Sequence, residues 1–343
     1  MNYRNNWGRY LIAVEVAVLI LVLVFGVVRF ILPDNKNSRN NNGQPDSEMI
    51  YNQTVGDTES DGDSNEINNI NTQIEPVAFS DDVNAKIQSM SVEQKVCQLF
   101  ITRPEEITGV SQFTQAGAKT KQAMSQYPLG GFVFSDSNFK ATAANKNMMA
   151  NIQKYANEQQ GLNMFLAVSK SDNTAGFMTD NALNMGIGIS ADTVSEYSGA
   201  GVYTALTGFP GENVTELPSI EDTIKQNALS GATAMVIDNF ACEALTGDAN
   251  MPCSVSVNSV GYLRNTAGFN GIIMTSDLSS GLPDGYGAPQ ASVEAVKAGV
   301  SMVWVSTGFN DCYTAVLDAA NSGEITEETL NQAVGRVLTI KMS

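Results

Sequence analysis

Short apolar runs separated by longer and more polar stretches characterise the chain from about residue 81 to its end. Continuous apolar strands that alternate with helical stretches are typical of a parallel sheet covered on both faces. Eight such units within residues 81–343 predict a TIM-type (β/α)8 barrel, complete or incomplete. An open doubly wound sheet is the alternative, although no G-x-G-x-x-G motif follows any run. The runs are VCQLFI (96–101), GGFVF (130–134), MFLAV (164–168), GIGI (186–189), VYTAL (202–206), AMVI (234–237), GIIMT (271–275) and MVWVS (302–306).

The first part of the chain has a different pattern. Residues 10–32 are apolar except for Glu15 and Arg29, and at about 1.5 Å per residue they are long enough to cross a bilayer core. Trp7 precedes the run, as interfacial aromatic residues do. A cleaved signal peptide is the alternative, but no small-x-small cleavage site follows the run. We therefore predict an uncleaved transmembrane anchor at 10–32, preceded by a short N-terminal segment, residues 1–9.

Residues 33–80 are rich in Asn, Asp, Ser, Gly and Glu and contain few residues that could fill a core. This composition predicts a disordered, acidic tether between the anchor and the barrel at 81–343.

The overall charge and the absence of histidine exclude several classes of function. The chain has 19 Lys and Arg against 36 Asp and Glu, a net charge of -17, so it repels nucleic acid. Without histidine there can be no Ser-His-Asp triad, no Cys-His pair and no histidine-ligated zinc. Acid and base chemistry would have to use carboxylates, lysine, tyrosine or cysteine. We expect neither a metal nor another cofactor.

The chain contains four cysteines and no C-x-x-C pair, so a metal knuckle or thioredoxin-type motif is not supported. One interpretation is four buried small hydrophobic residues. The alternative is a disulfide between Cys242 and Cys253, which lie close enough in sequence to bridge one loop and which an oxidising compartment would allow.

Six segments between about residues 86 and 341 resemble, in order, the motifs of a known family. They read MSVEQKVCQLF (90–100), YPLGGF (127–132), FPG (209–211), GFNGII (268–273), AGVSM (298–302) and GEI through RVL (323–338). The series is similar to M-(T/S)-x-E-E-K-(V/I)-G-Q-L-F, Y-P-x-G-G-(V/I), F-P-G, G-F-x-G-(V/I)-(V/I), A-G-A-D-M and G-x-I…R-(I/V)-L of the glycoside hydrolase family 3 N-terminal barrel. The bacterial β-N-acetylhexosaminidase branch is the most similar. The resemblance implies a glycan-related role outside the cell membrane, with residues 1–9 in the cytoplasm.

The same resemblance shows where catalytic residues would lie. A retaining glycosidase needs a nucleophile and a proton donor across the scissile bond. The family's nucleophile is the aspartate of (S/T)-D-(D/x)-L after the seventh strand, and Ser276 occupies that position when the segments are aligned without a gap. Asp277 is its neighbour, and neighbours in an extended segment point to opposite sides. The branch's donor is an Asp-Ser-His unit, but here the corresponding loop, 211–218, is shortened and the chain has no histidine.

Other polar motifs of the family are changed as well. The sugar-gripping Lys-His before F-P-G is Thr207-Gly208, and the A-V-D-x-E-G-G-R-V motif becomes AVSKSDNTA at 167–175. The family's N-F-A-P-V-x-D run is missing after Ile189. The scaffold motifs are therefore retained while the polar contact positions differ.

The leading hypothesis is a pseudoenzyme with no catalytic residues, which binds peptidoglycan, another envelope glycan or an envelope protein, and binds the lipid bilayer through residues 10–32. The alternative is an active β-N-acetylhexosaminidase-like glycosidase with relocated carboxylates, for which Asp277, Glu212, Glu216 and Asp238 are the candidates. A third interpretation is a structural envelope protein that binds no sugar.

Overall fold

The computed structural model describes residues 70–169, 183–211 and 214–343, all within one compact unit, Gly62–Ser343. The predicted anchor at 10–32 and residues 33–69 of the predicted tether lie outside the described residues. None of the helices in the described ranges is both long enough and apolar enough to cross a membrane.

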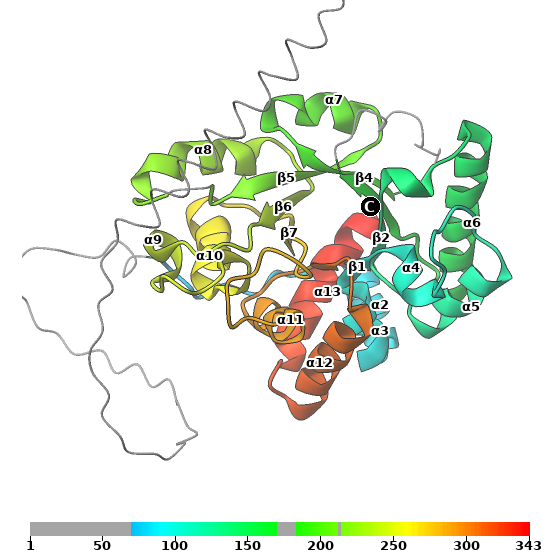
Figure 1. Cartoon of the computed structure of the whole chain (residues 1–343). Helices are drawn as coiled ribbons and strands as arrows, with labels where there is room; N and C mark the ends of the chain where they lie inside the picture. The colour runs from blue at the N-terminus through cyan, green and yellow to red at the C-terminus, as the bar shows by residue number, and fades with distance from the viewer. Residues whose placement is uncertain (1–69, 170–182, 212–213) are drawn as a thin grey trace, which may run out of the picture. The chain divides into compact units, whose positions relative to one another are not determined.

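Eight parallel strands form the centre of the domain (Figure 1). Each strand pairs with the next one along the chain from β1 to β7, and β1 also pairs with β8. The predicted TIM-type barrel is confirmed. The strands are β1 (Phe100–Thr102), β2 (Gly131–Phe134), β3 (Phe165–Ser169), β4 (Leu183–Ile189), β5 (Tyr203–Phe209), β6 (Ala234–Ile237), β7 (Ile272–Thr275) and β8 (Val303–Val305).

The barrel is nearly closed, and its last seam is the weakest. Between β7 and β8 there is one parallel bridge, Met274 with Met302, in place of a full ladder. The Thr275 amide donates to the Met302 carbonyl over 3.1 Å, and the Leu278 amide donates to the Trp304 carbonyl over 2.9 Å. These bonds hold the strand ends together where the candidate site lies.

Helices lie outside the strands, as the polar stretches between the apolar runs predicted (Figure 1). One run was assigned wrongly in part. Residues 96–98 of VCQLFI belong to α3, which begins with a capping box between Ser91 and Gln94, and the strand starts at Phe100. The helix buries Val96 and Cys97, so its inner face resembles a strand in sequence. The described α-helices are α2 (Asp81–Ser89), α3 (Val92–Gln98), α4 (Pro104–Thr108), α5 (Ala118–Gln126), α6 (Thr142–Gln160), α7 (Val194–Gly199), α8 (Pro218–Leu229), α9 (Glu243–Thr246), α10 (Val257–Gly261), α11 (Ala288–Lys297), α12 (Phe309–Ser322) and α13 (Glu327–Lys341).

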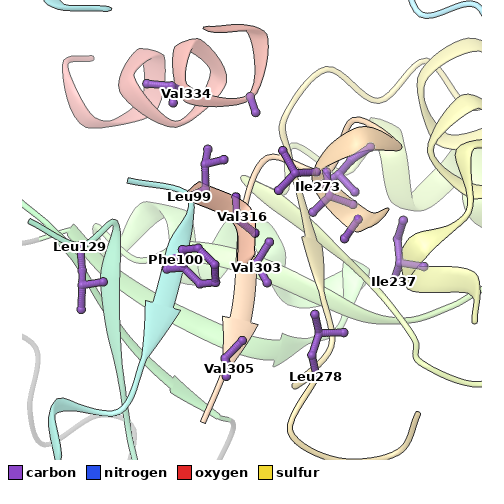
Figure 2. Close-up of a cluster of buried hydrophobic side chains, with 14 of the residues drawn as sticks. Leu99, Phe100, Leu129, Ile237, Ile273, Leu278, Val303, Val305, Val316 and Val334 are labelled. Carbon is purple, nitrogen blue, oxygen red and sulfur yellow. The ribbon is translucent and has the colours of Figure 1, made fainter. Parts of the chain in front are cut away.

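Two apolar clusters account for most of the buried core. The larger one joins the outer faces of the strands to the helices, and Figure 2 shows part of it, including Phe100 of β1, Val303 of β8 and Val334 of α13. The second cluster fills the barrel interior with side chains from every strand between β1 and β7. It includes Val337 of α13, and Ile340 packs against it. The last turns of α13 therefore close one end of the barrel.

Residues 70–79, the end of the predicted tether, pack against the barrel as an extended strap. Ile74 and Phe79 contact the larger core cluster, and the Val77 backbone exchanges two hydrogen bonds with the Gln332 side chain of α13, 3.0 and 3.2 Å long. The expected start of the folded domain at 81 is therefore too late. The strap's few apolar side chains are spaced among polar ones, so its composition resembles that of the rest of the predicted tether.

Glycine at position 335 makes room for the strap. A Cβ placed there would lie 2.3 Å from the Phe79 ring. We expect Gly335→Ala to lower the free energy of unfolding by about 1–3 kcal/mol, because overpacking forces the ring or the helix to move. Urea denaturation of the full chain measures this change. In a Phe79→Ala background the penalty should disappear, and Gly199→Ala, where a Cβ meets nothing within 4 Å, is the matched control. Equal losses in both backgrounds would contradict the steric explanation.

Candidate active-site cleft

A cleft of about 500 Å³ opens at the carboxyl ends of β5 to β8. Ligand sites of (β/α)8 barrels lie at this face, because the loops after the strands meet there. Its described lining residues are Gly208, Gly211, Asp238, Asn239, Phe240, Ser276, Asp277, Ser280, Gly281 and Trp304. The set contains two carboxylates and neither lysine nor arginine.

Ser276, which the motif alignment places at the family's nucleophile position, lies directly after β7 and lines this cleft. Its amide donates to the Ile237 carbonyl over 2.8 Å, which fixes the backbone against the end of β6. Its hydroxyl donates to Oδ1 of Asp238 over 3.2 Å. The end of β7 therefore presents to the cleft a neutral hydroxyl that hydrogen-bonds a carboxylate.

Asp277 also lines the cleft, but its side chain bonds towards the end of β8, whereas that of Ser276 bonds towards Asp238 after β6. The strand ends at Thr275, and the chain then turns, with the Ser280 amide donating to the Asp277 carbonyl over 3.2 Å. Oδ1 of Asp277 accepts from the Ser279 amide at 3.1 Å and hydroxyl at 2.6 Å, and from the Ser306 amide at 2.9 Å. This carboxylate connects the loop after β7 to the end of β8.

Of the three other predicted acids, one lines the cleft, one does not, and one lies outside the described residues. Asp238 follows β6 and lines the cleft beside Ser276. Glu216 is exposed and is not among the lining residues, whereas Glu212 lies outside the described residues. Only Asp238 and Asp277 of the four candidates are thus brought together at the cleft among the described residues.

Gly208, which the motif alignment places opposite the family's sugar-gripping histidine, has a backbone unsuited to a larger side chain. Gly208 has φ of 90°, a left-handed conformation that L side chains rarely adopt. The β5–β6 register shifts between Leu206 and Phe209 at the same point. A larger side chain at this position would therefore strain the local backbone.

Five lining residues were not predicted from the sequence: Trp304, Asn239, Phe240, Ser280 and Gly281. Trp304 of β8 is half-buried and donates from Nε1 to the Ser306 hydroxyl over 3.0 Å. Asn239 donates from Nδ2 to the carbonyls of Asp277 and Ser280 over 2.8 and 2.9 Å. Phe240, the residue after Asn239, is half-buried. An aromatic residue in the last positions of a barrel strand was the one signal that could have indicated Trp304.

No group of three or more His, Cys, Asp and Glu side chains that could hold a metal ion occurs within the residues that the structure describes.

Cys242 and Cys253 lie together beside the cleft as buried free thiols. Ala241 and Pro252, the residues before them, form an antiparallel bridge, and the Cys253 amide donates to the Phe240 carbonyl over 3.0 Å. Burial, followed by the neighbouring Cys242, raises the pKa of the Cys253 thiol to about 12. A disulfide between the two is not formed in this structure, and the pairing remains a prediction.

We expect protein isolated under oxidising conditions to lose two hydrogens through this pair, because an oxidising exterior favours disulfides and the two thiols are neighbours. Intact-mass measurement before and after reduction detects the difference. Cys97→Ser should leave it unchanged, while Cys253→Ser should abolish it. Four free thiols in the oxidised sample would contradict the pairing.

Comparisons with known proteins agree with this geometry. Residues 189–340 match the model of the glycosyl hydrolase family 3 N terminal domain. A search of curated proteins found no match.

Solved structures of the same architecture resemble the domain. A glycoside hydrolase family 3 β-N-acetylglucosaminidase from Paenibacillus sp. has a TM-score of 0.65 at 17% identity, covering 74% of this chain and 62% of that one. A β-N-acetylhexosaminidase from Beutenbergia cavernae has a TM-score of 0.59 at 16% identity, covering 74% of this chain and 99% of that one. A family 3 glycosyl hydrolase from Mycobacterium smegmatis has a TM-score of 0.58 at 16% identity, covering 74% of this chain and 98% of that one. The resemblance to the glycoside hydrolase family 3 N-terminal barrel that the motifs indicated is therefore confirmed.

Proposed function

We propose that this chain is a membrane-anchored pseudoenzyme of the family 3 type, a glycan- or protein-binding scaffold of the cell envelope. The observation that carries the proposal is the hydroxyl of Ser276, which lies at the nucleophile position and donates to Asp238. An alcohol supplies neither the negative charge nor the covalent carboxylate ester that retaining glycosidases use. The cleft is kept while its chemistry is changed, which favours binding over turnover.

An active glycosidase with relocated carboxylates is the second candidate, because Asp238 and Asp277 both line the cleft. Asp277 is poorly suited as a nucleophile, since Oδ1 already accepts from the Ser306 amide and from both groups of Ser279. Asp238 would have to act while accepting the Ser276 hydroxyl. Turnover of an aryl β-N-acetylglucosaminide by the full chain, compared with Asp238→Asn and Asp277→Asn, tests the two candidates.

The proposal includes the location outside the membrane, with residues 1–9 in the cytoplasm and 10–32 in the bilayer. It is supported by the apolar composition of 10–32 and by the resemblance to envelope glycan hydrolases.

We therefore expect Ser60→Cys to react with a membrane-impermeant maleimide on intact cells, because the tether would lie outside. Asn5→Cys, on the other side of the anchor, should react only after permeabilisation. The four native cysteines are buried, so their background labelling should be low. The reverse pattern of labelling would contradict this topology.

A further inference from the structure

The composition of the cleft restricts the charge of any ligand that it can bind. Asp238 and Asp277 are half-buried in its lining, and none of the described lining residues is a lysine or arginine. Carboxylates accept hydrogen bonds from charged donors more strongly than from neutral ones. An anionic ligand would find no counter-charge there, whereas a cation would find two.

A second observation concerns Asn239, which is 6% exposed and lines the cleft. Its Nδ2 is used by two carbonyls of the loop after β7, but its Oδ1 has no hydrogen-bond partner among the described residues. Buried acceptors of this kind are costly when unpaired. This oxygen has almost no accessible surface, so a ligand with N–H donors would pair with it only after the side chain shifts.

The remaining lining groups fit a sugar ring. Ser276 and Ser280 offer hydroxyls, and Trp304 and Phe240 offer aromatic rings. Aromatic faces attract cations as well as apolar ring faces. A volume of about 500 Å³ lies in the usual range for small-ligand sites.

We propose that the cleft binds an amino sugar whose amine is free and protonated, in preference to the N-acetylated sugar. The inference rests on the proposed function, since it names the ligand class of the same cleft. An ammonium group supplies three donors and a positive charge to the carboxylates of Asp238 and Asp277. Acetylation removes the charge and leaves a single N–H donor.

Isothermal titration of the full chain with a β-1,4-linked glucosamine trimer and with its N-acetylated counterpart tests this preference. At about pH 6, where an amine of ordinary pKa is protonated, we expect the free-amine trimer to bind at least about tenfold more tightly, roughly 1.4 kcal/mol. The preference should shrink at about pH 9 and at high salt, because it is electrostatic.

Asp238→Asn should reduce the preference, and Asp318→Asn on the exposed face of α12, which removes the same charge elsewhere, should not. Circular dichroism confirms that each variant is folded, and Asp277→Asn serves as a second cleft variant. Equal affinity for the two trimers, or binding of neither, would overturn the inference. Hydrolysis of a trimer in the same samples would instead contradict the pseudoenzyme proposal, so the two failures are distinguishable.

Discussion

The full chain should hydrolyse aryl β-N-acetylglucosaminides and β-glucosides no faster than the uncatalysed background. Proton transfer by a positioned acid contributes about 10²–10⁴-fold, and a single electrostatic contact to the transition state about 10²–10³-fold. Loss of both roles therefore predicts a rate at least roughly 10⁴–10⁷-fold below that of an active relative, and the further loss of the sugar contacts lowers it towards the background. The Paenibacillus enzyme that resembles this domain is a suitable positive control.

Substrates with different leaving groups separate the loss of the proton donor from the loss of the nucleophile. A weak leaving group needs a proton donor, whereas an activated aryl group needs little protonation, so it reports on the nucleophile alone. The wild type should be inactive with both. Ser276→Asp should stay at background with the weak leaving group, since the missing donor is not restored. Wild-type turnover that disappears in Asp277→Asn but persists in Asp318→Asn would overturn the pseudoenzyme proposal and identify a shifted nucleophile.

The second large effect should come from a buried lysine near the end of α13. Lys341 is 8% exposed, and its Nζ donates to Oε1 of Gln98 over 2.8 Å and lies 5.5 Å from the centre of the Phe165 ring. None of the described carboxylates forms an ion pair with it. Burial without a counter-charge lowers the pKa of Lys341 from 10.5 to about 7.

The sign of the pH effect follows from this shift. Between about pH 7 and 10.5 the unfolded chain binds a proton that the folded chain releases, so this group's contribution to stability rises with pH across that window. Below about pH 7 both the folded and the unfolded chain carry this proton, so the destabilisation from burying the charged Lys341 has its full value. Because Lys341→Met removes the titration, the difference in stability between wild type and variant should change by about 2–3 kcal/mol from pH 6 to pH 9, at 1.36 kcal/mol per pKa unit.

Urea denaturation of both proteins at a series of pH values measures this difference. At pH 6 the variant should be the more stable protein, by about 2 kcal/mol after allowance for the unpaired Gln98 oxygen that it leaves. Lys154→Met, on the exposed face of α6, should show no comparable dependence on pH. A constant difference between wild type and Lys341→Met across the range would show that Lys341 keeps an ordinary pKa when folded.

The architecture could be predicted from the sequence because it depends on local patterns. Apolar runs such as 130–134 and 234–237 indicate strands that are buried on both faces, and their alternation with polar stretches favours a barrel. The one partial error, at 96–98, arose because the buried face of a short helix can resemble a strand in composition. The identity of Ser276 after the seventh apolar run and the absence of histidine were also determined by the sequence alone, because each is a matter of residue identity.

The surroundings of those residues were decided only by the tertiary structure. Asp238 and Ser276 are 38 positions apart and meet because parallel neighbouring strands bring their ends together. Lys341 meets Gln98 across 243 positions because α13 packs against α3. The turn after β7, which directs Asp277 towards Ser306, is fixed by hydrogen bonds from other loops and not by the periodicity of its own segment. Local periodicity reports which side of an element is buried, whereas the partner of each side chain depends on contacts between elements that the linear pattern does not encode.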